Sequence, residues 1–148
     1  LGEGESDFMK MWVGMMRQAT EFPWPMLAQG MTAKLSEAEL AAYRAPFPSP
    51  EYEAGICEFP VLIAVQTDNP GAPLNREAWA RLAEFRKPFL TIFGDLDPVA
   101  RGWDKRAHEH IPGARGQAHH NIAHASHFIQ EDAPQELVDH LIRFLAVH

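Results

Sequence analysis

The stretch Lys87-Pro-Phe-Leu-Thr-Ile-Phe-Gly-Asp-Leu-Asp-Pro-Val99 decides the fold. From Pro88 to Phe93 it is an apolar run rich in β-forming residues, and Gly94 closes it. Such a run is typical of a strand that is buried on both faces, as in a parallel sheet. We therefore predict a buried strand here, followed by a loop that carries Asp95 and Asp97.

The residues after this strand continue an α/β alternation. Residues 103–110 indicate a crossover helix, Pro112 and Gly113 a turn, and residues 117–123 a second strand. A last helix over 133–147, with Pro134 in its first turn, is expected to bury one face. That face consists of Leu137, Val138, Leu141, Ile142, Phe144 and Leu145. Strand, helix, strand, helix is the order of an α/β fold with a parallel sheet.

The residues before the strand favour helices and loops. Ser6 and Asp7 can cap a helix that ends before Pro23 and has apolar residues at helical spacing, namely Phe8, Met11, Trp12, Met15 and Met16. Ser36, with Glu39 three residues later, predicts a capping box for a short helix that ends at Ala45.

A proline-rich connection and a third helix complete this part. Between Pro46 and Pro73, prolines and glycines favour an irregular connection with one apolar interruption at 59–65. Asn75 can then cap a helix to Phe85, with a buried side formed by Trp79, Leu82, Ala83 and Phe85.

Composition narrows the class of protein and partner. Among 148 residues, 46% are hydrophobic and 22% charged, which is typical of a soluble globular domain. A net charge of −7 with no basic run argues against nucleic-acid and anionic-membrane partners, so we expect a small molecule. Cys57 is the one cysteine, which agrees with a reducing cytoplasm. No apolar stretch reaches the roughly 20 residues that span a bilayer.

The loops after the two expected strands carry the candidate chemistry. The first has Asp97 three residues beyond Gly94, and the second contains Ser126-His127-Phe128. Functional residues of open parallel sheets lie just past the carboxyl ends of strands. An acid and an imidazole there can form the orienting half of a nucleophilic triad. Asp95 is the competing acid, although its place directly after Gly94 suggests a turn-stabilising role.

Two other interpretations of these residue types stay open. The histidine pairs 108/110, 119/120 and 124/127 suggest a metal site, but no carboxylate or cysteine completes a familiar ligand spacing. Trp12 and the methionines beside it fit an ordinary core stripe of a helix. By pattern alone, packing is the better explanation of Trp12 and these methionines.

Several segments resemble the haloalkane dehalogenases, a family of α/β-hydrolases. They are the stretch 87–99, Ile111-Pro-Gly-Ala-Arg-Gly-Gln117, and Ala125-Ser-His-Phe-Ile-Gln-Glu-Asp132. Leu35 to Pro48, which ends in Ala-Pro-Phe-Pro, and Phe59-Pro60 resemble the cap domain of that family. The strand and histidine motifs occur across the superfamily, whereas the cap segments are narrower. The subgroup whose acid follows the late strand fits best.

The resemblance implies an architecture and an incomplete site. Residues 1–74 would form a helical cap, and residues 75–148 the C-terminal part of the α/β-hydrolase core. The chain opens at Leu1 without an initiator Met, and its residues include no nucleophile elbow, oxyanion loop or second halide tryptophan. We therefore expect these residues alone to be inactive, and the sheet edge before the Pro88 strand to lack a partner within them.

The resemblance also implies roles for individual residues. Asp97 would be the triad acid, His127 the base, and Trp12 the cap residue whose indole N–H holds the departing halide. Phe59, Pro60 and Val99 fall where the family lines its apolar pocket. The reaction would convert a halogenated alkane to an alcohol and halide through an alkyl-enzyme ester, without a metal or organic cofactor.

Two departures and two alternatives qualify this expectation. Met9 stands where the family often has an aromatic residue, and Ser126 replaces the commoner glycine before the histidine. One alternative is an epoxide hydrolase, a fluoroacetate-type dehalogenase or another α/β-hydrolase that shares the fold and triad. Epoxide hydrolases use cap tyrosines as acids, whereas Tyr43 and Tyr52 lie in or beside the segments that resemble dehalogenases. The alternative from another class is an inactive binding or structural module.

Overall fold

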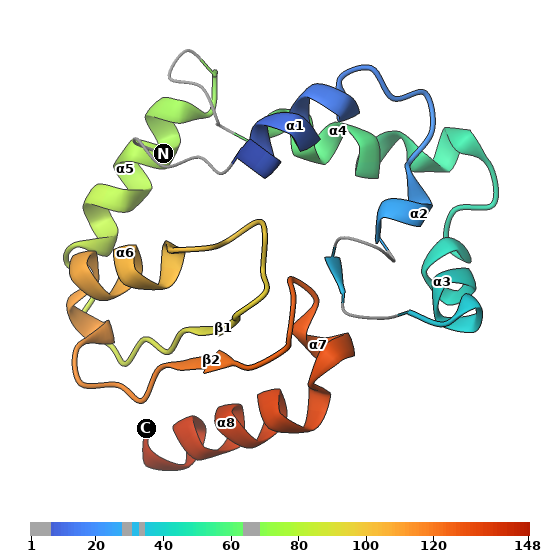
Figure 1. The fold of residues 1–148 in the computed structure, drawn as a ribbon. Helices are drawn as coiled ribbons and strands as arrows, with labels where there is room; N and C mark the ends of the chain where they lie inside the picture. Colours follow the sequence, from blue (N-terminus) through green and yellow to red (C-terminus); the bar gives the residue numbers. More distant parts are fainter. Residues whose placement is uncertain (1–6, 28–30, 33–34, 64–68) are drawn as a thin grey trace.

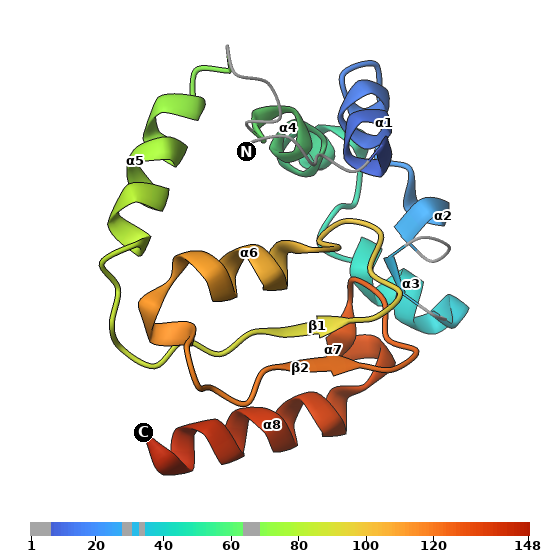
Figure 2. The same cartoon turned by 60° about the vertical axis from the view of Figure 1, so that its left-hand side comes forward.

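A computed structural model describes residues 7–27, 31–32, 35–63 and 69–148. Ser6 and residues 64–65, which the sequence analysis assigned to a helix start and an apolar segment, lie outside the described residues. Figures 1 and 2 show two regions: helices α1 to α4 gather on one side, and the strand pair lies between α6 and α8.

The first region is helical. It contains α1 (Asp7–Met16), α2 (Trp24–Met26), α3 (Glu37–Arg44), the 3-10 turn η2 (Pro50–Glu53) and α4 (Ala54–Leu62). Ser36 and Glu39 form the predicted capping box: the Ser36 hydroxyl accepts the Glu39 N–H, and the Glu39 carboxylate accepts the Ser36 N–H at 2.8 Å. This helix start is therefore confirmed.

The expectation of an irregular connection after Pro46 is wrong. Residues 54–62 form the helix α4, which contains Pro60 and lies alongside α1. Cys57 and Val61 of this helix pack against the buried cluster around Trp12. Tertiary packing of an apolar face has overridden the local turn preferences of proline and glycine.

A buried carboxylate fixes the loop between α1 and α2. Glu53 accepts the Trp24 indole N–H at 2.8 Å and the Phe22 backbone N–H at 2.7 Å, and only 8% of it is exposed. These hydrogen bonds hold the pKa of Glu53 below its usual value. Helix α1 ends at Met16 rather than just before Pro23, so residues 17–23 form a connection that Glu53 holds at its end.

The second region is the predicted α/β alternation. It contains α5 (Ala72–Leu82), β1 (Ile92–Gly94), α6 (Trp103–His110), the 3-10 turn η3 (Pro112–Ala114), β2 (His120–Ile122), α7 (Ile129–Asp132) and α8 (Pro134–Val147). The strands are parallel, with Ile92 opposite His120 and Gly94 opposite Ile122. Parallel strands connected through helices form the α/β architecture that the sequence predicts.

The strands are shorter than the apolar runs that predicted them. Before β1, the Phe89 N–H donates to the Gly113 carbonyl at 3.0 Å, and the Thr91 N–H donates to Nδ1 of His119 at 3.1 Å. These N–H groups therefore do not take part in the pairing of β1 with β2, which begins only at Ile92. Within the described residues β1 pairs with β2 alone, so its other edge has no strand, as predicted.

The helices α5 and α8 differ from expectation in start and burial. Helix α5 begins at Ala72, which puts Asn75 inside the helix rather than at its cap. On α8, four side chains expected to be buried are 41–71% exposed, namely Val138, Leu141, Ile142 and Leu145. The described part of the chain supplies no second layer over that face. No helix of the described residues is long and apolar enough to cross a bilayer.

Candidate active site

Asp97 is a buried carboxylate held by its own loop. Its Oδ1 accepts the backbone N–H groups of Val99 at 2.7 Å and Ala100 at 3.0 Å, and 4% of the residue is exposed. Burial alone would raise its pKa, but hydrogen bonds from His127, Ala100 and Val99 outweigh that effect and lower the pKa of Asp97. Asp97 is therefore an anion at neutral pH.

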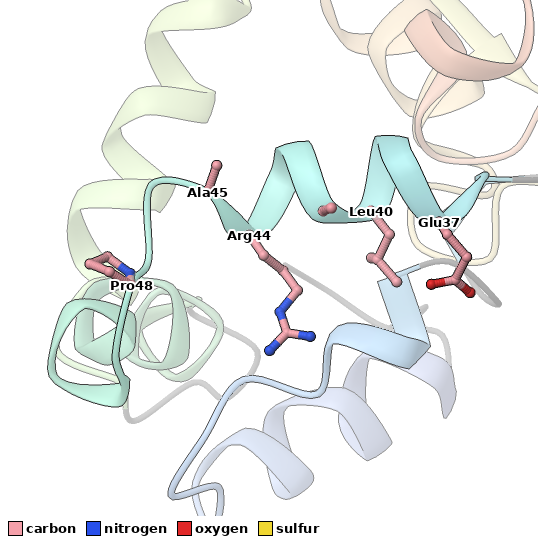
Figure 3. A pocket seen from close by; sticks show the side chains of 6 residues that line it. Glu37, Leu40, Arg44, Ala45 and Pro48 are labelled. Atoms are coloured by element: carbon pink, nitrogen blue, oxygen red, sulfur yellow. The ribbon is translucent and has the colours of Figure 1, made fainter.

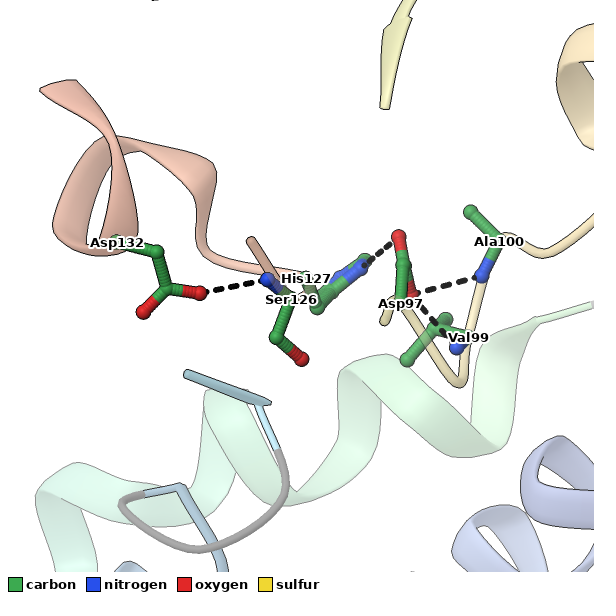
Figure 4. A network of polar contacts seen from close by, with 6 residues as sticks. All are labelled: Asp97, Val99, Ala100, Ser126, His127 and Asp132. Carbon is green, nitrogen blue, oxygen red and sulfur yellow. Dashed lines mark hydrogen bonds and ion pairs between the residues drawn. The ribbon is translucent and has the colours of Figure 1, made fainter. Parts of the chain in front are cut away.

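The second oxygen of Asp97 contacts the candidate base. Nδ1 of His127 lies 3.0 Å from Oδ2 of Asp97, as Figure 4 shows. The sequence-based prediction that these two residues come together is confirmed. Because Nδ1 is occupied by the carboxylate, Nε2 is the ring nitrogen left to accept a proton. About a third of the His127 side chain is exposed, so a water molecule can reach the imidazole.

Asp95, the competing acid, instead ties the two loops together. Its Oδ1 accepts the backbone N–H of His124 at 2.8 Å. His124 has a φ of 63°, an unusual conformation for a residue other than glycine. The Leu96 N–H also donates to the Ala125 carbonyl at 3.0 Å. The acid loop and the histidine loop are thus joined through their backbones.

This joining requires glycine at position 94. A Cβ added to Gly94 would lie 2.3 Å from the Ala125 carbonyl oxygen and 2.4 Å from that of Ser126. Both obstacles are backbone atoms of the loop that carries His127, so they cannot move away as a flexible side chain would. Gly94 therefore sets the approach of the two loops.

We expect Gly94→Ala to destabilise the protein by about 1–3 kcal/mol, the usual cost of overpacking, and to separate Asp97 from His127. Urea unfolding measures the first effect. Gly14→Ala is the matched control, because a Cβ there meets nothing within 4 Å on the exposed side of α1. That variant should gain about 0.5–1 kcal/mol through its better helix propensity. Equal stability of the two variants would contradict this account of Gly94.

The histidine loop is also anchored on its other side. The Ser126 N–H donates to the Asp132 carboxylate at 2.6 Å (Figure 4). Among the described residues other than glycine, His124 is the one with positive φ, so Ser126 has an ordinary backbone conformation. The serine that replaces the family's commoner glycine is accommodated without strain.

Trp12 lies in a buried cluster that reaches both loops. It is 7% exposed and forms the cluster with Met16 and Met31. Val99 and Phe128, which follow Asp97 and His127 in the sequence, pack against this cluster. No hydrogen bond joins the Trp12 indole N–H to another described residue. Met9, in the position where the family often has an aromatic residue, is also buried on α1.

The other residues expected to line the pocket differ in where they lie. Val99 packs against the Trp12 cluster, whereas Phe59 is 73% exposed on α4 and Pro60 is buried on the same helix. The structure thus brings Val99 to Trp12 but does not bring Phe59 there. Cys57 and Val61, which the sequence analysis did not single out, occupy that position on α4.

Tyr43 makes a contact that sequence reasoning missed. Its hydroxyl donates to Oε1 of Glu131 at 2.6 Å, and its ring stacks on Phe128 with centroids 6.0 Å apart. The Phe128 N–H donates to the Met31 carbonyl at 2.7 Å. The helical region thus contacts the residues that follow His127. The partners are 88 positions apart, a distance over which periodicity and spacing give no signal.

The histidines pair by stacking rather than around a common centre. His108 stacks on His119 with ring centroids 3.7 Å apart, and His120 stacks on His140 at 3.4 Å. In the described ranges, no group of three or more histidine, cysteine or carboxylate side chains is arranged to hold a metal ion.

Two surface pockets lie near these elements. One, of about 310 Å³, lies along α3 and is lined by Leu40, Arg44 and Pro48 among others (Figure 3). It includes none of the candidate site residues. A second, of about 260 Å³, lies beside the acid loop and includes Asp97, Lys105 and Asn121. It contains neither His127 nor Trp12.

Comparisons with known proteins agree on one family. No protein-family model matches the chain. A haloalkane dehalogenase of Psychrobacter cryohalolentis is 38% identical over 146 residues, which cover 98% of this chain and 47% of the relative. A haloalkane dehalogenase of Mycobacterium marinum is 44% identical over 117 residues, 79% of this chain and 39% of the relative. The chain thus spans about half the length, or less, of the curated relatives it matches.

A solved structure supports the same relation. The crystal structure of an ancestral haloalkane dehalogenase superposes with a TM-score of 0.65 and 26% sequence identity, covering 90% of this chain and 50% of that one. Sequence and fold therefore place the chain with the haloalkane dehalogenases of the α/β-hydrolase superfamily, as the counterpart of about half of such an enzyme.

Proposed function

We propose that the protein to which these residues belong hydrolyses halogenated alkanes to an alcohol and a halide ion. The observation that carries the proposal is the buried cluster that contains Trp12, because Val99 and Phe128, which follow the acid and the base in the sequence, pack against this cluster. Asp97 with His127 would serve any hydrolase of this superfamily. An indole N–H donor from the cluster that both loops contact would suit a reaction that releases an anion.

In the proposed mechanism, a carboxylate outside these residues attacks the halogen-bearing carbon. The carbon–halogen bond breaks with its electron pair on the halide, which Trp12 stabilises, and an alkyl ester forms. Nε2 of His127 then takes a proton from water, whose oxygen attacks the ester carbonyl. The alcohol leaves with the proton returned by His127. Asp97 holds the imidazole and stabilises its cation throughout. No step needs a metal or an organic cofactor.

The proposal assigns residues 1–74 to a cap and residues 75–148 to the catalytic core. Trp12, Phe59 and Pro60 would belong to the cap, and Val99 to the core side of an apolar substrate pocket. The substrate partner would be a small halogenated alkane, with neither nucleic acid nor membrane involved. Cys57, the one cysteine of the chain, supports cytoplasmic residence.

An epoxide hydrolase is the alternative enzyme, and the tyrosines argue against it. Such an enzyme needs a cap tyrosine whose hydroxyl can protonate the epoxide oxygen. The Tyr43 hydroxyl already donates a hydrogen bond to Glu131, and Tyr52 is 63% exposed. Neither is prepared to act as that acid. An inactive binding module would have no use for a buried acid aligned on a histidine.

The test is substrate choice by the full-length protein. We expect bromide release from a short bromoalkane, with equimolar alcohol, and no hydrolysis of an epoxide or an ester of similar size. An ion-selective electrode and gas chromatography measure the products. Hydrolysis of the epoxide or the ester without halide release would contradict the proposal, and inactivity on all three would favour the binding module.

A further inference from the structure

Three contacts join the helical region to the segment that begins directly after His127. The Met31 carbonyl accepts the Phe128 N–H at 2.7 Å, the Tyr43 ring stacks on Phe128, and the Tyr43 hydroxyl donates to Glu131 at 2.6 Å. The last contact is a hydrogen bond to a carboxylate, the stronger kind. Tyr43 is only half-buried, so water could satisfy its hydroxyl if Glu131 did not.

The histidine loop is held at both ends, by contacts with the acid loop before His127 and by contacts with the helical region after it. Before His127, the loop is joined to the acid loop through Asp95 and Leu96. After His127, the Glu131 N–H donates to the Phe128 carbonyl at 2.9 Å and starts α7. Glu131 is therefore part of the turn that sets the direction of the chain leaving His127, and Tyr43 is its side-chain partner.

We propose that Tyr43 is a positioning residue, which fixes the His127 imidazole by holding Phe128 and Glu131 against the helical region. The proposal rests on the proposed function, because it concerns the base of that reaction. Among the described residues, no hydrogen bond or ring contact joins Tyr43 to Asp97 or His127, so Tyr43 would act through Glu131 and Phe128. The Phe128 ring in turn lies 5.7 Å from the His127 ring, measured between centroids. Burial and the hydrogen bond to Glu131 both raise the pKa of Tyr43, so the hydroxyl keeps the proton that the contact requires.

Tyr43 lies on α3, and the residues it contacts follow the base closely in the sequence. Loss of these contacts would allow the histidine loop to shift relative to Asp97. Misplacing a catalytic group by about 1 Å can cost about 10²-fold in rate, so loss of one of several anchors should cost less.

Tyr43→Phe tests the proposal, because it keeps the ring on Phe128 and removes only the hydroxyl. In the full-length protein we expect kcat for bromide release to fall about tenfold, since one restraint of several is lost, with KM little changed. Glu131→Gln should retain most of the rate, because its amide oxygen still accepts the Tyr43 hydroxyl. Glu131→Ala should resemble Tyr43→Phe, and the double variant should lose no more than either one.

A second measurement does not depend on dehalogenase activity. The ¹H–¹⁵N signals of the His127 ring should shift and broaden in Tyr43→Phe, and the Phe128 amide should exchange faster with solvent. Tyr52→Phe is the matched control, because Tyr52 is 63% exposed and its hydroxyl has no hydrogen bond to another described residue. Additive losses in the double variant, or unchanged His127 signals, would overturn the positioning role. Changed signals in a protein without halide release would uphold it and contradict only the proposed function.

Discussion

Replacing His127 by Gln should stop the proposed reaction at the alkyl ester. The first step needs no base, so the halide should leave once per active site, and the ester should then persist. General-base catalysis typically contributes about 10²-fold to 10⁴-fold in rate, and steady-state turnover should fall by at least that factor. Mass spectrometry of the intact protein should find the mass of the alkyl group added.

A neighbouring histidine provides the control for this experiment. His124 lies three residues earlier in the same loop, is exposed, and has a φ of 63° that asparagine tolerates better than most residues. His124→Asn should therefore keep its turnover and accumulate no adduct. If His127→Gln releases no burst of halide and gains no mass, the two-step mechanism is wrong for this protein.

Trp12→Phe should weaken halide stabilisation and leave packing largely intact. The phenyl ring replaces the indole in the cluster with Met16 and Met31, and only the N–H donor is lost. Removing one such preorganised donor costs about 10²-fold to 10³-fold in rate at comparable sites. We expect bromide turnover to fall by about that factor and halide affinity to weaken, while the melting temperature changes little.

Tryptophan fluorescence measures the halide affinity directly. Bromide should quench the wild-type protein at lower concentration than the Trp12→Phe variant. Trp103→Phe is the control, because Trp103 is 44% exposed on α6 and away from the cluster. That variant should keep the wild-type affinity. Unchanged bromide affinity in Trp12→Phe would show that this tryptophan has a packing role alone. The proposed function would then lack the observation on which it rests.

The sequence by itself determined the class of fold and placed the candidate acid and base on neighbouring loops. An apolar run rich in β-forming residues and closed by Gly94 indicates a buried strand. Loops that follow parallel strands meet at one edge of the sheet, so an aspartate of the first loop was expected near His127. Only the structure shows that Asp97, and not Asp95, contacts the imidazole. The capping box at Ser36 is likewise local, since both partners lie within one helical turn.

Tertiary structure alone decided the rest, because the deciding contacts join residues far apart in the sequence. Helix α4 forms despite Pro60 and packs along α1, and Glu53 holds the connection after α1 through Phe22 and Trp24. Burial along α8 depends on a layer that local pattern cannot supply. The Tyr43–Glu131 bond spans 88 positions and serves no local preference of either residue. A sequence shows which faces are apolar and which groups are reactive, whereas only the folded chain shows what each of them meets.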